Sequence, residues 1–290
     1  MQWIDDLATQ KRYVAGFVDF MASNQKYIWS TNQNSLQKWS NDQTLPIAEI
    51  IVPKAAGIPV CAFGAVWVAS LANNSIYKID IERDEVIAII ETGLADQTGE
   101  FSLACSDDGI WLAADYGKVV KIDPIQHQVV GEVTVLPHSY NLTFSNDALW
   151  ISNTQHSSVQ RIDPKLLQVT HTIDVDHTPW FLTATPDYVF TLNQTHGTVS
   201  KIESKTCQLL ATIQLPELAR GDGGDIFASG QRLWVRTTHL LLIEIDISNN
   251  QIVRQIQHNE TAGSGAVMQC HDHLWITAHD IETVWLLPIE

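Results

Sequence analysis

Histidine is the side chain in this sequence best suited to acid–base chemistry. The chain has 11 His, and an imidazole takes up or releases a proton near neutral pH. Seven of them fall in two kinds of polar loop that recur along the chain: His138, His156, His177, His196, His239, His258 and His279. We predict that His279 is the general acid or base, with His239 or His177 assisting.

A charged residue near these loops needs a partner. Arg236 stands two residues after Trp234, where equivalent positions elsewhere in the chain carry mostly small residues. Its guanidinium can pair with Asp222 or Asp225, or it can anchor a carboxylate or other anion. Both readings stay open, and we include Arg236 and Asp225 in the predicted ligand-binding set.

Two aromatic residues occupy matching positions in consecutive parts of the sequence. Tyr140 and Trp180 each precede an aromatic anchor, described below, by ten residues. They can form an apolar wall for a planar ligand, or they can pack as ordinary loop residues. His138 and Glu282 complete the predicted ligand-binding residues.

The sequence predicts no metal site and no disulfide framework. His271 and His273 form a His-x-His pair without the nearby ligands that a zinc site requires. Four Cys residues occur and none forms a C-x-x-C pair, so we expect small buried fillers in a reducing compartment. With no signal peptide in the start of the chain, this favours the cytoplasm.

These side chains belong to a repeat of about forty residues. An aromatic anchor in a β-rich run recurs every 38 to 44 residues, at Trp29, Trp67, Trp111, Trp150, Phe190, Trp234 and Trp275. After most anchors come a polar loop, an alternating strand that ends in Asp, a turn and a further alternating strand. Period-two alternation without helical periodicity indicates strands. We expect the Asp residues to accept backbone N–H groups in the turns.

The repeat predicts the fold class. Four-stranded antiparallel units in tandem bury their faces only by packing radially against one another. The prediction is an all-β, seven-bladed β-propeller that covers residues 1–290 as one domain. The last copy has no outer strand of its own, so we expect the N-terminal segment around residues 2–8 to pair there and close the ring.

This geometry brings the histidines together. In a propeller, the loops that precede each inner strand and those that follow each second strand open on one face, around the central channel. The seven His residues all lie in these two kinds of loop. Polar loops also collect His without any function, and the sequence leaves that alternative open.

Composition restricts the partners. Asp and Glu outnumber Lys and Arg by 33 to 17, which gives a formal net charge of −16. Because nucleic acids and anionic membranes attract basic surfaces, neither is an expected partner. We expect a small-molecule ligand or a protein partner, and we predict no membrane segment.

The units VWVAS…NSIYKID, KIDP…QVVGEVTV and LWIS…VQRIDP resemble those of the virginiamycin B (streptogramin) lyase-like superfamily and the related YVTN-type propellers. The resemblance covers nearly the whole chain and implies seven blades. In the lyase it implies a site at the funnel mouth, where His residues, a Glu and a magnesium ion open a cyclic depsipeptide ester by elimination. Magnesium is a cofactor that only this resemblance implies.

The chain departs from the family at the site itself. The positions of the family His residues correspond to Gly223 or Gly224 and to Gly265, and the position of the Glu corresponds to His279. We therefore predict a small-molecule-binding propeller that is not itself a streptogramin lyase, with lyase-type acid–base chemistry if it is an enzyme. The alternative is a non-catalytic scaffold for protein interaction.

Overall fold

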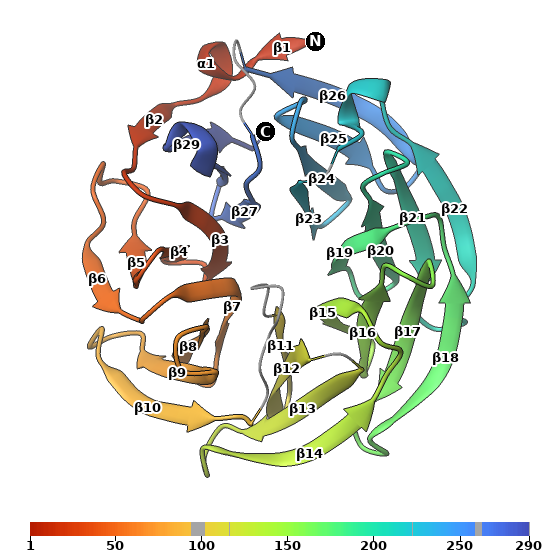
Figure 1. The fold of residues 1–290 in the computed structure, drawn as a ribbon. Coiled ribbons are helices and arrows are strands. Elements are labelled where there is room, and N and C mark those ends of the chain that lie inside the picture. The colour runs from red at the N-terminus through yellow and green to blue at the C-terminus, as the bar shows by residue number, and fades with distance from the viewer. Residues whose placement is uncertain (94–101, 116, 222, 259–262, 290) are drawn as a thin grey trace.

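The computed structural model describes residues 1–290 except 94–101, 116, 222, 259–262 and 290. Figure 1 shows sheets arranged radially around a central axis, so the predicted all-β β-propeller is confirmed. The described helices are short: α1 (Ile4–Leu7), η1 (Glu217–Ala219) and η2 (His279–Ile281). No helix among the described residues is long and apolar enough to cross a membrane.

The first half of the ring contains three sheets. The first has the order β3 (Val18–Ser23), β4 (Ile28–Asn32), β5 (Ser35–Trp39) and β6 (Ala48–Ile51). The second has eight strands, in two antiparallel groups of four: β7 (Ala55–Ala62), β8 (Ala65–Ser70), β9 (Ser75–Asp80) and β10 (Val86–Glu91), then β11 (Ser102–Ser106), β12 (Gly109–Asp115), β13 (Lys118–Asp123) and β14 (Gln128–Thr134). A parallel pair between Ile58 and Ser102 joins β7 to β11. The third has the order β15 (Ser139–Ser145), β16 (Ala148–Asn153), β17 (Ser158–Asp163) and β18 (Gln168–Asp174).

The second half also contains three sheets, and the last two include strands from the N-terminus. The first has the order β19 (Pro179–Ala184), β20 (Tyr188–Asn193), β21 (Thr198–Glu203) and β22 (Leu209–Gln214). The next joins β1 (Gln2–Trp3) to β26 (Gln251–Gln257), β25 (Leu242–Asp246), β24 (Arg232–Thr237) and β23 (Gly224–Ser229). The last joins β2 (Gln10–Tyr13) to β29 (Thr283–Pro288), β28 (His273–Ala278) and β27 (Val267–Cys270).

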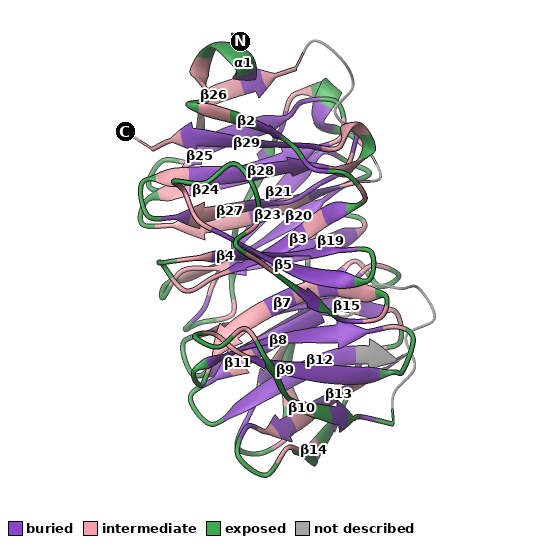
Figure 2. Cartoon of the chain, turned by 90° about the vertical axis from the view of Figure 1, so that its left-hand side faces the viewer, coloured by how far each residue is buried: buried purple, intermediate pink, exposed green. Residues whose placement is uncertain are grey.

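The aromatic anchors hold neighbouring groups of four strands together. Trp67 of β8 is fully buried and packs in one cluster with Leu103 of β11 and Ile110 of β12. Six of the seven anchors have 1% exposure or less, and Trp234 has 2%. Replacing a buried aromatic residue by Ala typically costs about 3–5 kcal/mol, so these wedges are a major part of the stability. In Figure 2 the buried residues follow the strands and the exposed ones follow the connections.

The turn aspartates have the structural role that the sequence predicted. Asp123 Oδ1 accepts the backbone N–H groups of Ile125 and Gln126, both at 2.7 Å. These bonds hold the pKa of the Asp123 carboxyl below its usual value. Equivalent bonds are made by Asp80, Asp163 and Asp246.

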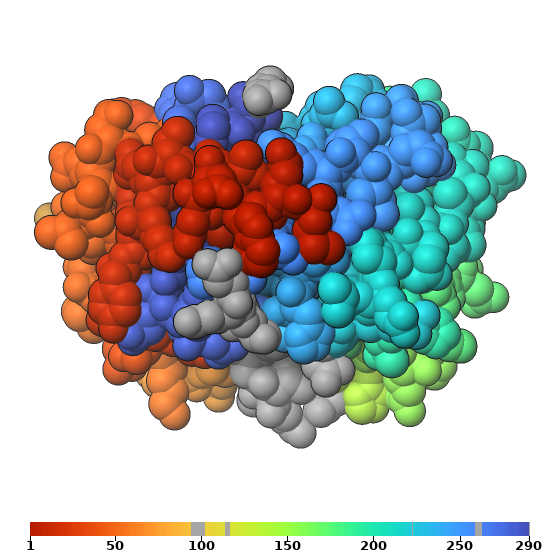
Figure 3. Space-filling model, turned by 90° about the horizontal axis from the view of Figure 1, so that it is seen from above, coloured from red at the N-terminus to blue at the C-terminus, as the bar shows by residue number. Residues whose placement is uncertain are grey.

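The N-terminal segment pairs with the last sheet, through different residues from those predicted. Strand β2 is antiparallel to β29, with Gln10 opposite Leu286 and Tyr13 opposite Thr283. The prediction that residues 2–8 supply this strand is wrong, because Ile4 is fully buried in the core instead. Strand β1 pairs in parallel with β26 of the neighbouring sheet. Figure 3 shows the N-terminal residues, in red, on the outside of the ring beside the blue residues of the last two sheets.

Candidate functional site

The candidate site lies where the last two sheets meet the first sheet. The backbone N–H of Gly224 donates to Ser264 Oγ at 3.2 Å, and the N–H of Ser264 donates to Asp280 Oδ2 at 3.1 Å. The N–H of Gly16 donates to Glu282 Oε1 at 2.9 Å. Loops from both ends of the chain are thereby tied together, and we call the loops 13–17, 223–224, 263–266 and 279–282 the seam site.

His279 is the best-positioned base of the seam site. Its Nδ1 lies 3.0 Å from Asp280 Oδ1, and its ring stacks on Phe17 with centroids 3.9 Å apart. Its side chain is only 9% exposed. Burial lowers the pKa of His279, with Asp280 acting in the opposite direction and the charge of Arg236 adding to the decrease. A neutral ring whose Nδ1–H donates to Asp280 has a free electron pair on Nε2, which is the arrangement of a general base.

Arg236 lies inside the wall of the site and has no exposed surface. Its Nε donates to the carbonyl of Thr277 at 3.1 Å, and Nη1 donates to the carbonyl of Thr237. Burial lowers its pKa to about 10, against the carboxylates of Asp19, Asp225 and Asp280. The charge therefore acts on the seam site through the protein, at short range and with little screening.

Asp225 is the carboxyl closest in register to this arginine. The two residues are directly opposite each other on β23 and β24. Asp225 Oδ1 accepts the N–H of Ile226 at 2.8 Å, and Oδ2 accepts the N–H of Val267 at 3.1 Å. Burial nevertheless raises the pKa of Asp225 to about 7, so this carboxyl carries a proton for part of the time at neutral pH. Asp222, the other predicted partner of Arg236, lies outside the described residues.

Glu282 connects the seam site to the N-terminal segment. Its backbone lies in the left-handed region with φ of 50°, and its carboxylate accepts the hydroxyl of Tyr13 and the N–H of Gly16. The bond from Tyr13 is the main reason that the pKa of Glu282 is lowered. Glu282 thus fixes the segment that carries Phe17, and both of its carboxylate oxygens are engaged.

His239 is exposed in the loop after β24. This loop touches the seam site, because a side chain at Gly223 would lie within 3.0 Å of both Ser264 and Thr238, the residue before His239. The loop that carries His239 therefore adjoins the seam-site loops 223–224 and 263–266.

The other predicted residues form a second group, on β15–β21. His177 is exposed and its ring contacts that of His196. His138 is half-buried, and its carbonyl accepts the N–H of Thr154 at 3.3 Å. No hydrogen bond or ring contact among the described residues joins His177 or His138 to His279.

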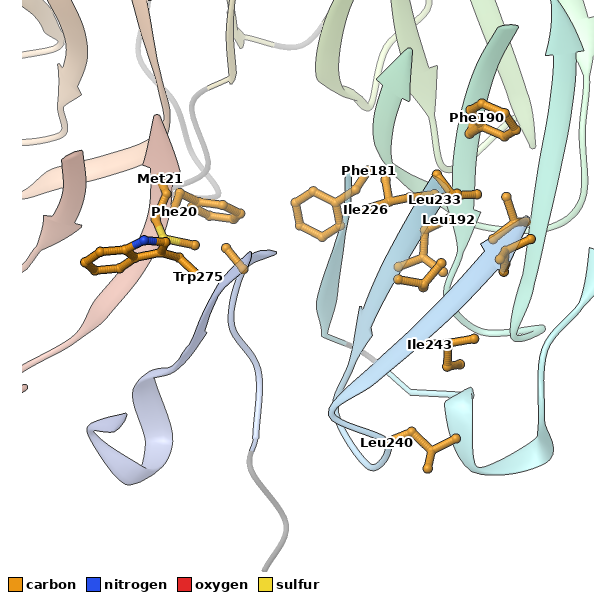
Figure 4. Close-up of a cluster of buried hydrophobic side chains, with 14 of the residues drawn as sticks. Phe20, Met21, Phe181, Phe190, Leu192, Ile226, Leu233, Leu240, Ile243 and Trp275 are labelled. Carbon is orange, nitrogen blue, oxygen red and sulfur yellow. The ribbon is translucent and has the colours of Figure 1, made fainter. Parts of the chain in front are cut away.

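Tyr140 and Trp180 stack on each other, with centroids 4.6 Å apart and an angle of 30° between the planes. Both are half-buried and line a cavity with room for about one water molecule. Phe20 and Phe181 also line it and face each other across the centre of the ring at 5.7 Å (Figure 4). The rings of Tyr140 and Trp180 thus stack on each other and leave no gap between them for the ring of a ligand.

The structure adds to the site two residues that the sequence did not predict. Asp19 stands ten residues before Trp29, the same position that Tyr140 and Trp180 hold before their anchors, and its charge acts on Arg236. This shared position is a signal that the sequence contains. Phe17 has no such signal, because its stacking partner His279 is at the other end of the chain.

Two glycines of this region leave no room for a side chain. A Cβ at Gly224, which has φ of +134°, would lie 2.1 Å from the Arg236 carbonyl oxygen, and one at Gly265 would lie 2.1 Å from that of Thr277. The backbone therefore excludes histidine at Gly224 and Gly265, two of the three positions that the family resemblance suggests, and at Gly223 the side chains of Ser264 and Thr238 crowd the position. No group of three His, Cys, Asp or Glu in the described chain is arranged to hold a metal ion. The residues do not fit the magnesium site of the resemblance, and we derive no step through that ion.

Comparison with solved structures identifies the fold. The chain matches the crystal structure of selenomethionine-substituted virginiamycin B lyase from Staphylococcus aureus with a TM-score of 0.80 and 16% identity, over 97% of this chain and 99% of that one. A streptogramin B lyase structure matches with a TM-score of 0.81 and 16% identity, over 96% and 97%. The fold is that of the streptogramin lyases.

No protein-family model and no curated protein matches the sequence. The structural matches alone establish the resemblance seen in the repeat units, and they establish it for the fold. At 16% identity it does not carry the lyase's activity to this chain.

Proposed function

We propose that this protein is a small-molecule-binding β-propeller with lyase-type acid–base chemistry at the seam site, and that it is not a streptogramin lyase itself. The observation that carries the proposal is the His279–Asp280 pair. An imidazole whose pKa is lowered by burial and whose Nδ1 is paired with a carboxylate is a base that works without a metal ion.

The pKa values of two groups support a division of roles. Burial lowers the pKa of His279 and raises that of Asp225 to about 7. Near neutral pH the imidazole is therefore neutral, while part of the Asp225 population is protonated. Such opposed shifts are typical of acid–base pairs. Both groups interact with the charge of Arg236.

The proposed reaction is an elimination. His279 Nε2 takes a proton from carbon, the electrons of the C–H bond form a double bond, and the bond to the leaving oxygen breaks with its electron pair. Asp225 supplies the proton to that oxygen. Arg236 stabilises negative charge that develops nearby, acting from within the wall. His239, on the adjacent loop, contacts the parts of the ligand that do not react. His177, Tyr140, Trp180 and His138 belong to the separate group on β15–β21 and take no part in this step.

The proposed ring has seven blades closed by β2. Support comes from the eight-stranded sheet, which is two antiparallel groups of four joined at Ile58 and Ser102, and from the position of β2 beside β29. Seven blades would place every loop of the seam site on one face.

Identification of the bound molecule tests the function. The purified wild type, His279→Gln and the control His171→Gln, an exposed residue of outer strand β18, are extracted and analysed by mass spectrometry. We expect His279→Gln to retain a small molecule that the wild type and His171→Gln convert and release. If no variant retains a molecule, or if all three retain the same amount, the proposal is contradicted.

The pH dependence of the conversion provides a second test. Activity requires neutral His279 and protonated Asp225, so it rises as pH increases through the lowered pKa of His279 and falls above about pH 7. A rate that keeps increasing above pH 8 would remove Asp225 from the mechanism.

A specific observation favours the scaffold alternative as a second candidate. Outer strands expose large apolar side chains, among them Ile87 and Ile89 of β10 and Leu210 of β22, at 43–54%. Exposed apolar residues on edge strands are typical of surfaces that bind proteins. Replacing all three by Thr would abolish a scaffold function and leave the ligand of the seam site unchanged.

The proposed setting is the cytoplasm, and the proposed partners include neither nucleic acid nor membrane. All four cysteines are free, which suits a reducing compartment. The net charge of −16 opposes binding to phosphate backbones.

A further inference from the structure

Two imidazoles form a pair outside the seam site, on the loops that follow β18 and β20. The rings of His177 and His196 have centroids 4.6 Å apart and planes at 74°. Both residues are exposed, and the side chain of His196 is 45% exposed. Two exposed imidazoles this close together can bind one ligand between them.

The partners of the two rings leave the same nitrogen available on each. His177 Nδ1 lies 3.1 Å from Ser157 Oγ, and His196 Nδ1 lies 2.8 Å from Asp176 Oδ1. With Nδ1 occupied on both rings, the Nε2 atoms remain for an external ligand. A carboxylate on Nδ1 is the usual second contact of a histidine that binds a metal ion, because it fixes the tautomer and makes Nε2 more basic.

Asp176 is itself fixed in place. Its Oδ1 accepts the backbone N–H of His177 at 2.8 Å, and its Oδ2 accepts the hydroxyl of Thr198 at 2.7 Å. One carboxylate therefore orients the ring of His196 and the backbone of His177 together. The pair is built by local contacts between two adjacent sheets.

We propose that His177 and His196 bind one divalent transition-metal ion through their Nε2 atoms, with Asp176 and Ser157 holding the rings. Because metal–imidazole bonds are about 2.0–2.1 Å, two imidazoles on adjacent positions of one ion have ring centres roughly 4.5–5 Å apart, close to the separation observed. Imidazole ligands suit copper, nickel and zinc. No third protein ligand is arranged around the pair in the described chain, so water completes the coordination and remains exchangeable.

Titration of the full chain with metal salts tests the site. The protein is stripped with a chelator and titrated with CuCl₂, NiCl₂ and ZnCl₂ by calorimetry, and the copper form is examined by electron paramagnetic resonance. We expect one ion per chain, with Cu²⁺ bound more tightly than Zn²⁺, and hyperfine coupling from two nitrogens.

Substitutions distinguish the pair from general surface binding. Either His177→Asn or His196→Asn is expected to weaken Cu²⁺ binding by about a hundredfold and to leave one coupled nitrogen, and Asp176→Asn to weaken it by about tenfold. The control His171→Asn removes an exposed imidazole whose Nδ1 contacts only Thr170, and it should bind as the wild type does. Thermal melting of every variant checks that the fold is kept.

Three results would overturn the proposal. One is the absence of stoichiometric binding, and another is an equal loss in the His171→Asn control. The third is a copper spectrum that shows no change in nitrogen coupling when His177 or His196 is replaced.

Discussion

The sheets from β3 to β22, which we call the regular sheets, differ from the last two sheets in the residue that lies opposite each aromatic anchor. From β3 to β22, a basic residue of the third strand lies directly across from each anchor: Trp29–Lys38, Trp67–Lys78, Trp111–Lys121, Trp150–Arg161 and Phe190–Lys201. In the last two sheets, Glu244 lies across from Trp234 and Leu286 lies across from Trp275.

In three of these copies the hydrogen bonds of the basic residue also reach the following copy. Lys78 Nζ lies 5.1 Å from the centre of the Trp67 ring and donates to the Pro124 carbonyl of the next turn at 2.8 Å. Lys201 Nζ lies 4.0 Å from the centre of the Tyr188 ring and donates to the Ile247 carbonyl at 2.7 Å. Lys38 also combines a cation–π contact with a hydrogen bond to the following copy, whereas Lys121 bonds to Asp108 of its own copy.

The last two sheets obtain their cations from elsewhere. Arg12 of β2 lies 4.4 Å from the centre of the Trp275 ring, and Glu244 is held between Arg232 at 3.2 Å and Arg254 at 2.8 Å. These sheets also contain the buried Arg236 and Asp225. The seam site therefore lies in the two sheets that lack the repeated pairing, and at Trp275 the N-terminal segment supplies the cation.

The largest expected effect is that of removing β2. Deleting residues 1–8 removes β1 and α1, including the buried Ile4, whereas deleting residues 1–13 also exposes the edge of β29. We expect the longer deletion to lower the melting temperature by about 10 °C more than the shorter one, or to prevent folding. Equal melting temperatures would show that β2 does not close the ring.

A smaller effect distinguishes Arg12, the cation that β2 supplies to the last sheet, from Lys201, a cation of a regular sheet. Arg12→Met is expected to cost about 2–4 kcal/mol, because the buried guanidinium also bonds to Gln10 and to the carbonyls of Ser40 and Asn41. Lys201→Met, the matched change in a regular sheet, is expected to cost about 1 kcal/mol. Chemical denaturation measures both. A larger cost for Lys201→Met would reverse the comparison.

The smallest effect concerns the turns, which both regions share. Backbone hydrogen bonds, the largest from Leu166, hold the pKa of Asp163 below its usual value, so the native state prefers the ionised carboxylate. Its contribution to stability is therefore present above about pH 4 and is lost as pH falls through the lowered pKa. The difference in melting temperature between Asp163→Ala and wild type should be constant from pH 5 to 7 and shrink below pH 4. A difference that does not depend on pH would contradict this.

The local parts of the structure could be predicted from the sequence. Strand alternation and the turn aspartates depend on residues within a few positions of one another, so the propeller and the role of Asp123 follow from the pattern. The pairing of the N-terminus could not be placed correctly, because neither residues 2–8 nor residues 10–13 show a period-two pattern in the sequence, and only the pairing with β29 and the burial of Ile4 distinguish them. The surroundings of Arg236 also depend on a neighbouring sheet, whose register the sequence does not give.

Contacts between the two ends of the chain could not be predicted from the sequence either. Phe17 and His279 stack although 262 positions separate them, and no spacing rule connects such residues. The predicted grouping of His177 with His279 followed from loop type alone. The type of loop indicates on which face of the ring a residue lies, but not beside which sheet. In the structure His177 contacts His196 instead.

The central claim is that burial keeps His279 neutral at neutral pH, against the opposing effect of Asp280, which orients the ring through Nδ1. Titration of its ring resonances by NMR, assigned with His279→Gln, measures this directly. The predicted midpoint lies below the ordinary histidine value of about 6.5, and Asp280→Asn should lower it further, since Asp280 raises the pKa of His279. A midpoint at or above 6.5, or one that Asp280→Asn leaves unchanged, would contradict the account.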